Sequence, residues 1–82
     1  GTNGISVRHG LSTPDSEEAA VKRAMIASAN YVVVAADSSK VGREDFISFA
    51  PLSSVDALIT DSEISGAYRE QLTEQGIEVV VA

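Results

Sequence analysis

Cysteine and tryptophan are absent from this chain of 82 residues, and histidine occurs once, at His9. Without cysteine neither a disulfide framework nor a thiolate metal site can form, and one histidine gives zinc no ligand set, so we expect no metal and no other cofactor. A chain free of disulfides suits a reducing compartment, and we expect the cytoplasm. Aromatic residues make up 5% of the sequence and hydrophobic residues 44%, which predicts a globular chain with an aliphatic core.

Basic residues are also few. Six Lys and Arg residues stand against twelve Asp and Glu residues, and the formal net charge is -6. Because contacts to a phosphate backbone need clustered Lys and Arg, and these six are scattered, we expect this segment itself not to bind nucleic acid. No apolar stretch approaches the roughly 18 residues of a membrane span, and the N-terminus lacks the features of a signal peptide, so no contact with a membrane is expected.

The length allows at most one domain, and a chain this short buries only about 60–65% of the surface that its unfolded form exposes. The sequence starts at Gly1 without a methionine and stops inside the apolar run of residues 79–82. We therefore expect residues 1–82 to be a piece of a longer chain.

The spacing of apolar residues predicts two helices. The first is expected to begin at Thr13 and Pro14, with the Thr13 hydroxyl as its cap, and to continue to about residue 29. Its core-facing side is expected to carry residues 21, 24, 25 and 28, which recur at helical spacing and include Val21 and Met25. The second helix is indicated by apolar residues at positions 64, 68 and 72, followed by Gly76 as a left-handed residue at its end.

Four strands are expected, at residues 31–36, 46–50, 56–60 and 77–81. The first of these is uniformly apolar, which predicts an interior parallel strand covered on both faces. The resulting order, α-β-β-β-α-β, predicts an α/β domain with a mostly parallel sheet and helices packed on it.

Polar side chains directly follow the apolar run of residues 31–36, namely Asp37, Ser38, Ser39 and Lys40. Ligands of open α/β sheets bind outside the carboxyl ends of the strands. Lys40 can neutralise an anion, the two serines and the loop amides can hydrogen-bond its oxygens, and Asp37 can hold the lysine or a substrate hydroxyl. This set suits a phosphorylated small molecule. The alternative is a surface turn in which Asp37 and the serines cap the strand end and Lys40 is solvated.

Six blocks of residues, in a fixed order, carry a resemblance that spans nearly the whole chain. The blocks are Gly4-Ile5, Gly10-Leu11-Ser12-Thr13, the stretch 17–26, Asp37-Ser38-Ser39-Lys40, Pro51-Leu52 and Ile59-Thr60-Asp61. Together they resemble the C-terminal half of the effector-sensing domain of DeoR family bacterial transcription regulators. The resemblance implies a partial ribose-5-phosphate isomerase-like fold, with the other sensor half and a helix-turn-helix DNA-binding domain upstream. In such sensors a phosphorylated sugar or related metabolite relieves repression.

The resemblance also assigns roles to individual residues. It makes Lys40 the phosphate contact, with Asp37 as its partner and Ser38 and Ser39 in the same loop. Asn3 and Gly4 match a loop that is Asp-Gly in the isomerases and lines the sugar hydroxyls. The second phosphate-binding loop of the family would lie before residue 1. The missing half leaves a sheet edge open, so we expect a homo-oligomer, with DNA bound only through the upstream domain.

Two departures from the isomerases weigh against catalysis. Asn3 stands in place of the acid and cannot take a proton, and Val21 precedes Lys22 where the isomerases carry a catalytic Glu. Glu18, one helical turn away, could replace that Glu. We therefore expect a binding module with no catalytic residue. The alternatives are a fragment of a sugar-phosphate isomerase-like enzyme on the same fold, and a structural fragment that serves only in oligomer contacts.

Overall fold

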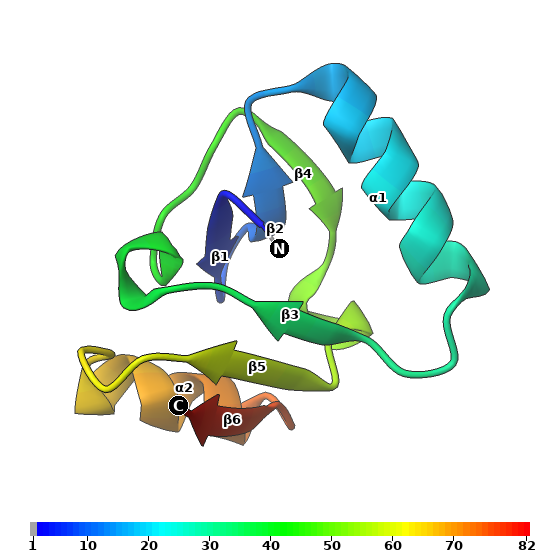
Figure 1. Cartoon of the computed structure of the whole chain (residues 1–82). Coiled ribbons are helices and arrows are strands. Elements are labelled where there is room, and N and C mark those ends of the chain that lie inside the picture. Colours follow the sequence, from blue (N-terminus) through cyan, green and yellow to red (C-terminus); the bar gives the residue numbers. More distant parts are fainter. Residues whose placement is uncertain (1) are drawn as a thin grey trace.

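The computed structural model of this chain describes residues 2–82, in which two helices and six strands follow the order β-β-α-β-β-β-α-β (Figure 1). The strands are β1 (Gly4–Ser6), β2 (Gly10–Thr13), β3 (Val33–Ala35), β4 (Ile47–Ala50), β5 (Ala57–Thr60) and β6 (Glu78–Val81). The helices are α1 (Ser16–Ser28) and α2 (Gly66–Glu74), and two short 3-10 turns are η1 (Ser38–Lys40) and η2 (Leu52–Ser54). The predicted order was wrong at the start of the chain, because β1 and β2 precede α1.

The strands β1, β2 and β4 form an antiparallel sheet in that order, called sheet A below. This sheet contradicts the prediction of a single, mostly parallel sheet. At Gly10 the backbone has a φ of 72°, and an added Cβ would lie 2.2 Å from the carbonyl oxygen of Ala50. Only glycine therefore fits the start of β2 without strain. β1 and β2 are three and four residues long and rich in Gly and Ser, so no alternating pattern indicated them in advance.

The strands β3, β5 and β6 form a parallel sheet in that order, called sheet B below, and α2 connects β5 to β6. The predicted second helix and the strands on both sides of it are confirmed. Leu72 of α2 is fully buried, and Ser65 caps the helix by accepting a hydrogen bond from the N–H of Tyr68. Gly76, with a φ of 85°, is the left-handed residue that follows the helix.

β3 is an edge strand within residues 2–82, and one face of sheet B is open. Val34 is buried, whereas Val33 on the opposite face is 49% exposed. The same face carries Ile59 and Val80, with exposed fractions of 39% and 40%. The prediction of an interior strand covered on both faces is therefore wrong for the described chain. We call the side chains of Val33, Ala35, Ile59 and Val80 the open face.

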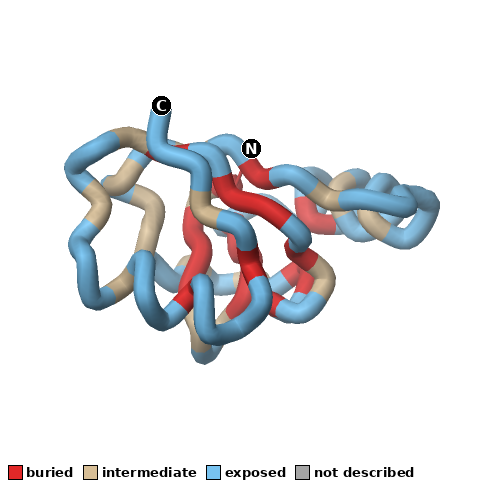
Figure 2. The backbone as a smooth tube through the Cα atoms, turned by 90° about the horizontal axis from the view of Figure 1, so that it is seen from below, coloured by how far each residue is buried: buried red, intermediate tan, exposed pale blue. Residues whose placement is uncertain are grey.

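Helix α1 presents a different side to the core from the one predicted. Asp15 caps it by accepting hydrogen bonds from the N–H groups of Glu17 and Glu18, so the predicted Thr13 cap is wrong. Ala19 is the buried residue of α1, and Ile26 packs against the core from the same side. Val21 and Met25 are 60% and 64% exposed. Figure 2 shows that most of α1, at the right of the view, is exposed.

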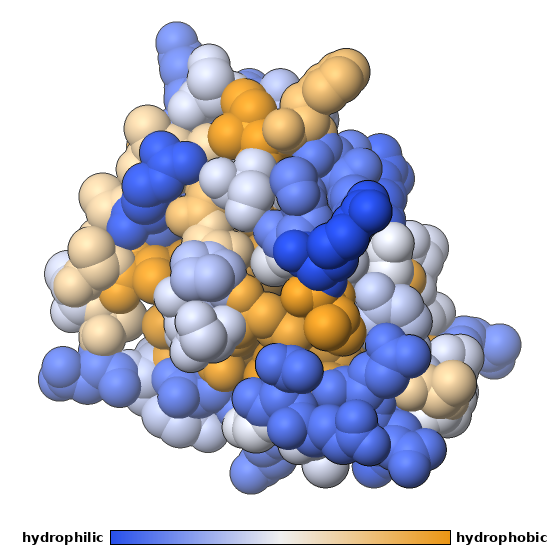
Figure 3. All heavy atoms as spheres, turned by 180° about the vertical axis from the view of Figure 1, so that it is seen from behind, coloured by the Kyte–Doolittle hydropathy of each residue, from blue (hydrophilic) through white to orange (hydrophobic). Residues whose placement is uncertain are grey.

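One cluster of hydrophobic side chains, mostly aliphatic, joins the two sheets. Ile5 and Leu11 of sheet A contact this cluster together with Val34 and Leu58 of sheet B. The buried backbone is concentrated in the middle of the molecule (Figure 2), and apolar side chains also reach the rear surface, with hydrophilic side chains around them (Figure 3). No helix of residues 2–82 is long and apolar enough to cross a membrane.

Candidate functional site

The turn η1 follows β3 and carries three of the predicted site residues. Asp37 precedes the turn, and its Oδ1 accepts hydrogen bonds from the backbone N–H of Ser39, at 2.9 Å, and from the Ser39 hydroxyl. These two bonds, the one from the hydroxyl first, lower the pKa of Asp37 below its ordinary range. Asp37 therefore shapes the turn as an ionised cap.

Asp61, directly after β5, holds the turn η1 from the neighbouring strand. Its Oδ2 accepts a hydrogen bond of 2.9 Å from the N–H of Ser38, and its Oδ1 accepts one of 2.9 Å from the N–H of Glu63. The bonds from Ser38 lower the pKa of Asp61, and the N–H of Glu63 adds to the effect. Sequence reasoning did not select Asp61 as a site residue. The sequence feature that could have indicated Asp61 is the one that indicated Asp37, an acidic residue directly after a predicted strand.

Lys40 ends the turn with its side chain half-buried, and it forms no ion pair within residues 2–82. The expected pairing of Asp37 with Lys40 is replaced by the bonds from Asp37 to Ser39. The positive charge of Lys40 still contributes to the low pKa of Asp37, behind the bonds from Ser39. The ammonium group is thus close to this carboxylate without being held by it, which leaves its charge available to an anion.

The predicted contact segment around Asn3 and Gly4 lies against the chain that follows Lys40. An added Cβ at Gly4 would lie 2.4 Å from the carbonyl oxygen of Arg43. The N–H of Gly42 donates a hydrogen bond of 2.7 Å to the carbonyl oxygen of Ile5, next to a parallel bridge between Ile5 and Val41. The structure therefore places the segment that begins at Gly4 against residues 41–43, which directly follow the turn η1.

The turn between β1 and β2 fixes the chain beyond Arg43. Glu44 accepts a hydrogen bond of 2.8 Å from the Ser6 hydroxyl and forms an ion pair with Arg8, and these contacts, Arg8 first, lower its pKa. The Nε2 atom of His9 lies 3.0 Å from the carbonyl oxygen of Asp45. His9 is thus engaged with the backbone of this loop.

The possible substitute base, Glu18, is distant from this site. Figure 1 places η1 and α1 at opposite sides of sheet A, with η1 at the left and α1 at the right. The Oε2 atom of Glu18 lies 3.4 Å from the Thr13 hydroxyl, which donates to it. No group of three or more His, Cys, Asp or Glu residues in the described part of the chain could hold a metal ion.

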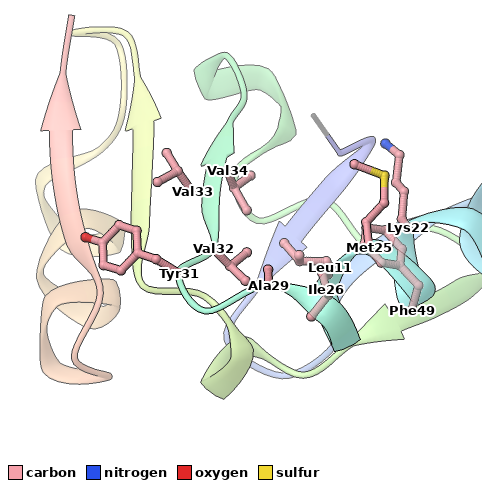
Figure 4. A pocket seen from close by; sticks show the side chains of 10 residues that line it. All are labelled: Leu11, Lys22, Met25, Ile26, Ala29, Tyr31, Val32, Val33, Val34 and Phe49. Carbon is pink, nitrogen blue, oxygen red and sulfur yellow. The ribbon is translucent and has the colours of Figure 1, made fainter.

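Two hollows lie elsewhere on the surface. One, of about 210 Å³, lies between α1 and β3 and is lined mainly by apolar side chains, including Met25, Ile26, Tyr31 and Val33 (Figure 4). The other, of about 450 Å³, lies beside the β1–β2 turn and includes Arg8 and His9. Neither is lined by residues 37–40. The candidate anion site is therefore separate from both of these hollows, and it is defined by polar groups that converge at the end of sheet B.

Acid is expected to destabilise the native chain, in part through Asp61. Because the pKa of Asp61 is lower in the folded chain than its ordinary 3.8, the unfolded chain binds this proton more tightly. The stabilisation is complete above the unfolded pKa and is lost as the pH falls through the folded one. The midpoint of thermal unfolding should therefore fall less steeply in Asp61→Asn than in the wild type between about pH 5 and pH 2. Equal slopes in the two proteins, with Glu74→Gln as a matched control, would contradict this role.

Comparison with known proteins gives consistent matches over this chain. Residues 1–62 match the family model of the DeoR C terminal sensor domain. The HTH-type transcriptional regulator GlpR of Haloferax volcanii is 42% identical over 80 residues, which are 98% of this chain and 31% of that protein. The HTH-type transcriptional repressor GlcR of Bacillus subtilis is 40% identical over 81 residues, 99% of this chain and 31% of the relative. The glycerol-3-phosphate regulon repressor of Escherichia coli is 32% identical over 79 residues, 96% and 31% of the two chains.

Proposed function

This chain belongs to the DeoR C-terminal sensor domain family, and from that premise we propose that it is the effector-sensing part of a transcriptional repressor of sugar catabolism. Binding of a phosphorylated sugar or related metabolite to the turn η1 would shift the population of conformers away from those that bind DNA. The proposal depends most on one observation. Within residues 2–82, Lys40 forms no ion pair, and Ser38 and Ser39 precede it on the turn η1. The carboxylates of Asp37 and Asp61 hold this turn through hydrogen bonds.

The ligand is proposed to be phosphorylated because the donors at η1 match a phosphate. An ammonium group, the hydroxyls of Ser38 and Ser39 and the loop amides are donors, and phosphate oxygens are strong acceptors. Asn3 is proposed to orient hydroxyl groups of the sugar from the neighbouring segment. One relative is named for the glycerol-3-phosphate regulon, which fits a phosphorylated polyol as the class of effector.

No catalysis is proposed. Asp37 and Asp61 are the carboxylates next to the turn. Hydrogen bonds from the hydroxyl and then the N–H of Ser39 lower the pKa of Asp37, and hydrogen bonds from Ser38 lower that of Asp61. A general base for proton abstraction near neutral pH needs a pKa close to 7, so both carboxylates are poor bases. Lys40 and its neighbours can bind and orient a sugar phosphate without breaking a bond in it. An assay for aldose–ketose interconversion by the full-length protein should show no turnover.

The coverage of the relatives supports a proposal for the domain organisation. The chain spans 31% of the length of the curated relatives reported above. Two of these three relatives are HTH-type regulators by name, so DNA binding is proposed to reside in a helix-turn-helix domain upstream of residue 1. We propose that residues 1–82 are the C-terminal half of the sensor. The upstream half would cover the open face and the free edge of β3, as parallel sheets require.

A thermal-shift screen of the full-length protein tests this function. Glycerol 3-phosphate, fructose 1-phosphate and deoxyribose 5-phosphate are the probes, with the unphosphorylated compounds and inorganic phosphate as controls. A ligand that binds only the native state stabilises it by about 2.7 kcal/mol at one hundred times its dissociation constant. At least one phosphorylated probe should therefore raise the midpoint of unfolding in proportion to the logarithm of its concentration. If none does, the sensor function proposed here is wrong.

The 82-residue chain alone is expected to self-associate. The open face and the free edge of β3 expose apolar side chains and unpaired backbone groups, which a second copy can cover. Sedimentation velocity should show a sedimentation coefficient that rises with concentration. Val33→Lys, which places a charge on this edge, should reduce the association, whereas Gln71→Lys on the exposed side of α2 should not. A monomer at all concentrations that unfolds cooperatively would identify an autonomous domain instead.

A further inference from the structure

The hydroxyl of Thr60 is buried without a partner. Thr60 is 4% exposed, and its Oγ1 forms no hydrogen bond within residues 2–82. In the described chain, one other buried side-chain atom has no hydrogen-bond partner, Oδ2 of Asp45. The Oδ1 atom of the same carboxylate lies 3.4 Å from a guanidinium nitrogen of Arg43. Buried polar groups in native proteins are almost always hydrogen-bonded, since an unsatisfied one destabilises the fold. The position of Thr60 therefore calls for an explanation.

Thr60 is the last residue of β5, at the end of the sheet where η1 lies. The next residue, Asp61, accepts the hydrogen bond from the N–H of Ser38. The backbone of Thr60 is engaged in the sheet, since its carbonyl oxygen accepts a hydrogen bond of 2.8 Å from the N–H of Ala82. The three residues of β5 that precede Thr60 are apolar, so the hydroxyl of Thr60 is the one polar side-chain group of this strand. It is one residue from the contact that holds η1.

The direction of the side chain points to the predicted contact segments. Side chains alternate along a strand, so Thr60 lies on the same face of sheet B as Leu58. Leu58 belongs to the cluster that contains Ile5 of sheet A, and Ile5 binds Gly42 just after Lys40. Thr60 therefore faces the side on which sheet A packs, and β1 of that sheet begins directly after Asn3.

We propose that the Thr60 hydroxyl contacts the phosphorylated effector and donates a hydrogen bond to one of its oxygens. This inference rests on the function proposed above and adds a residue from β5 to a site that otherwise comes from η1 and the segment around Asn3. The cost of the unsatisfied hydroxyl in the free protein is recovered when the ligand supplies an acceptor. Valine at this position would fill the same volume without that cost and without that contact.

Thr60→Val in the full-length protein tests the inference, because it should weaken ligand binding without lowering the stability of the free protein. Calorimetry with glycerol 3-phosphate, fructose 1-phosphate and inorganic phosphate measures affinity, and thermal unfolding without ligand measures stability. The variant should be as stable as the wild type or more stable, and it should bind the tightest sugar phosphate roughly 5- to 10-fold more weakly, the loss expected for one hydrogen bond. Thr60→Ser, which keeps the hydroxyl, should retain most of the affinity.

Thr73→Val is the matched control, since it removes the same group from the exposed side of α2. If Thr60→Val lowers stability and leaves affinity unchanged, the hydroxyl is structural and the inference is wrong. A wild-type protein that binds no probe would overturn both the inference and the proposed function, whereas equal binding by wild type and variant overturns the inference alone. Weaker binding of inorganic phosphate by the variant would assign the contact to a phosphate oxygen. An effect limited to the sugar phosphates would assign it to a sugar hydroxyl.

Discussion

Replacing Lys40 by alanine in the full-length protein is expected to weaken binding of the phosphorylated effector by roughly 10- to 150-fold. Hydrogen bonds to charged groups contribute about 1.5–3 kcal/mol, which corresponds to this range. Lys40 forms no ion pair within residues 2–82. Its replacement therefore breaks no salt bridge with a carboxylate of the described chain. The fold should therefore persist. Calorimetric titration with the tightest sugar phosphate measures the loss of affinity, and thermal unfolding without ligand checks the stability.

Two variants sharpen this prediction. Lys22→Ala removes the other lysine of the chain, on α1 beside the ring of Phe49, and should leave effector affinity within a factor of about two. Lys40→Arg keeps the charge and should retain part of the affinity. The dependence of binding on salt should also be weaker in Lys40→Ala than in the wild type. If Lys40→Ala binds as tightly as the wild type, Lys40 is not the anion contact.

Replacing Leu58 by alanine is expected to destabilise the native state by about 3–5 kcal/mol, a large part of the 5–15 kcal/mol typical of a whole domain. Leu58 is fully buried in the middle strand of sheet B and belongs to the cluster that joins the two sheets. Truncation of this side chain leaves a cavity between sheet A and sheet B, and the two sheets cannot move together to fill it. Equilibrium unfolding in urea measures the change.

Ile59→Ala is the matched control, because Ile59 is the next residue of the same strand and lies on the open face. In the 82-residue chain, under conditions where it is monomeric, this change should cost less than about 1.5 kcal/mol. In the full-length protein it should cost more, since the upstream half is proposed to cover that face. Equal costs of the two substitutions in the 82-residue chain would show that the open face is not open in solution.

The candidate site could be predicted from the sequence only in part. Lys40 and its neighbouring serines were selected as candidates because a local pattern, an apolar run followed by polar residues, indicates a strand end. Asp61 was missed because its role is a contact with Ser38, 23 residues away along the chain. Thr60, which we propose as a further contact, was not selected because a buried hydroxyl without a partner can be recognised only when its surroundings are known. Contacts between segments far apart in the sequence do not affect the local spacing of apolar and polar residues, so that spacing cannot predict them.

The sequence by itself determined α2, β5 and β6, because apolar spacing, the Ser65 cap and Gly76 all act within a few residues of each other. It also determined that a helix occupies the stretch after Pro14. The tertiary structure alone decided which side of that helix is buried, since small and apolar residues lie on two sides and only packing against sheet A selects Ala19 over Val21. It likewise decided sheet A. Strands of three or four residues have little intrinsic preference for the β conformation. β2 forms because β4, more than thirty residues along the chain, supplies its hydrogen-bond partner, and β1 pairs with the other edge of β2.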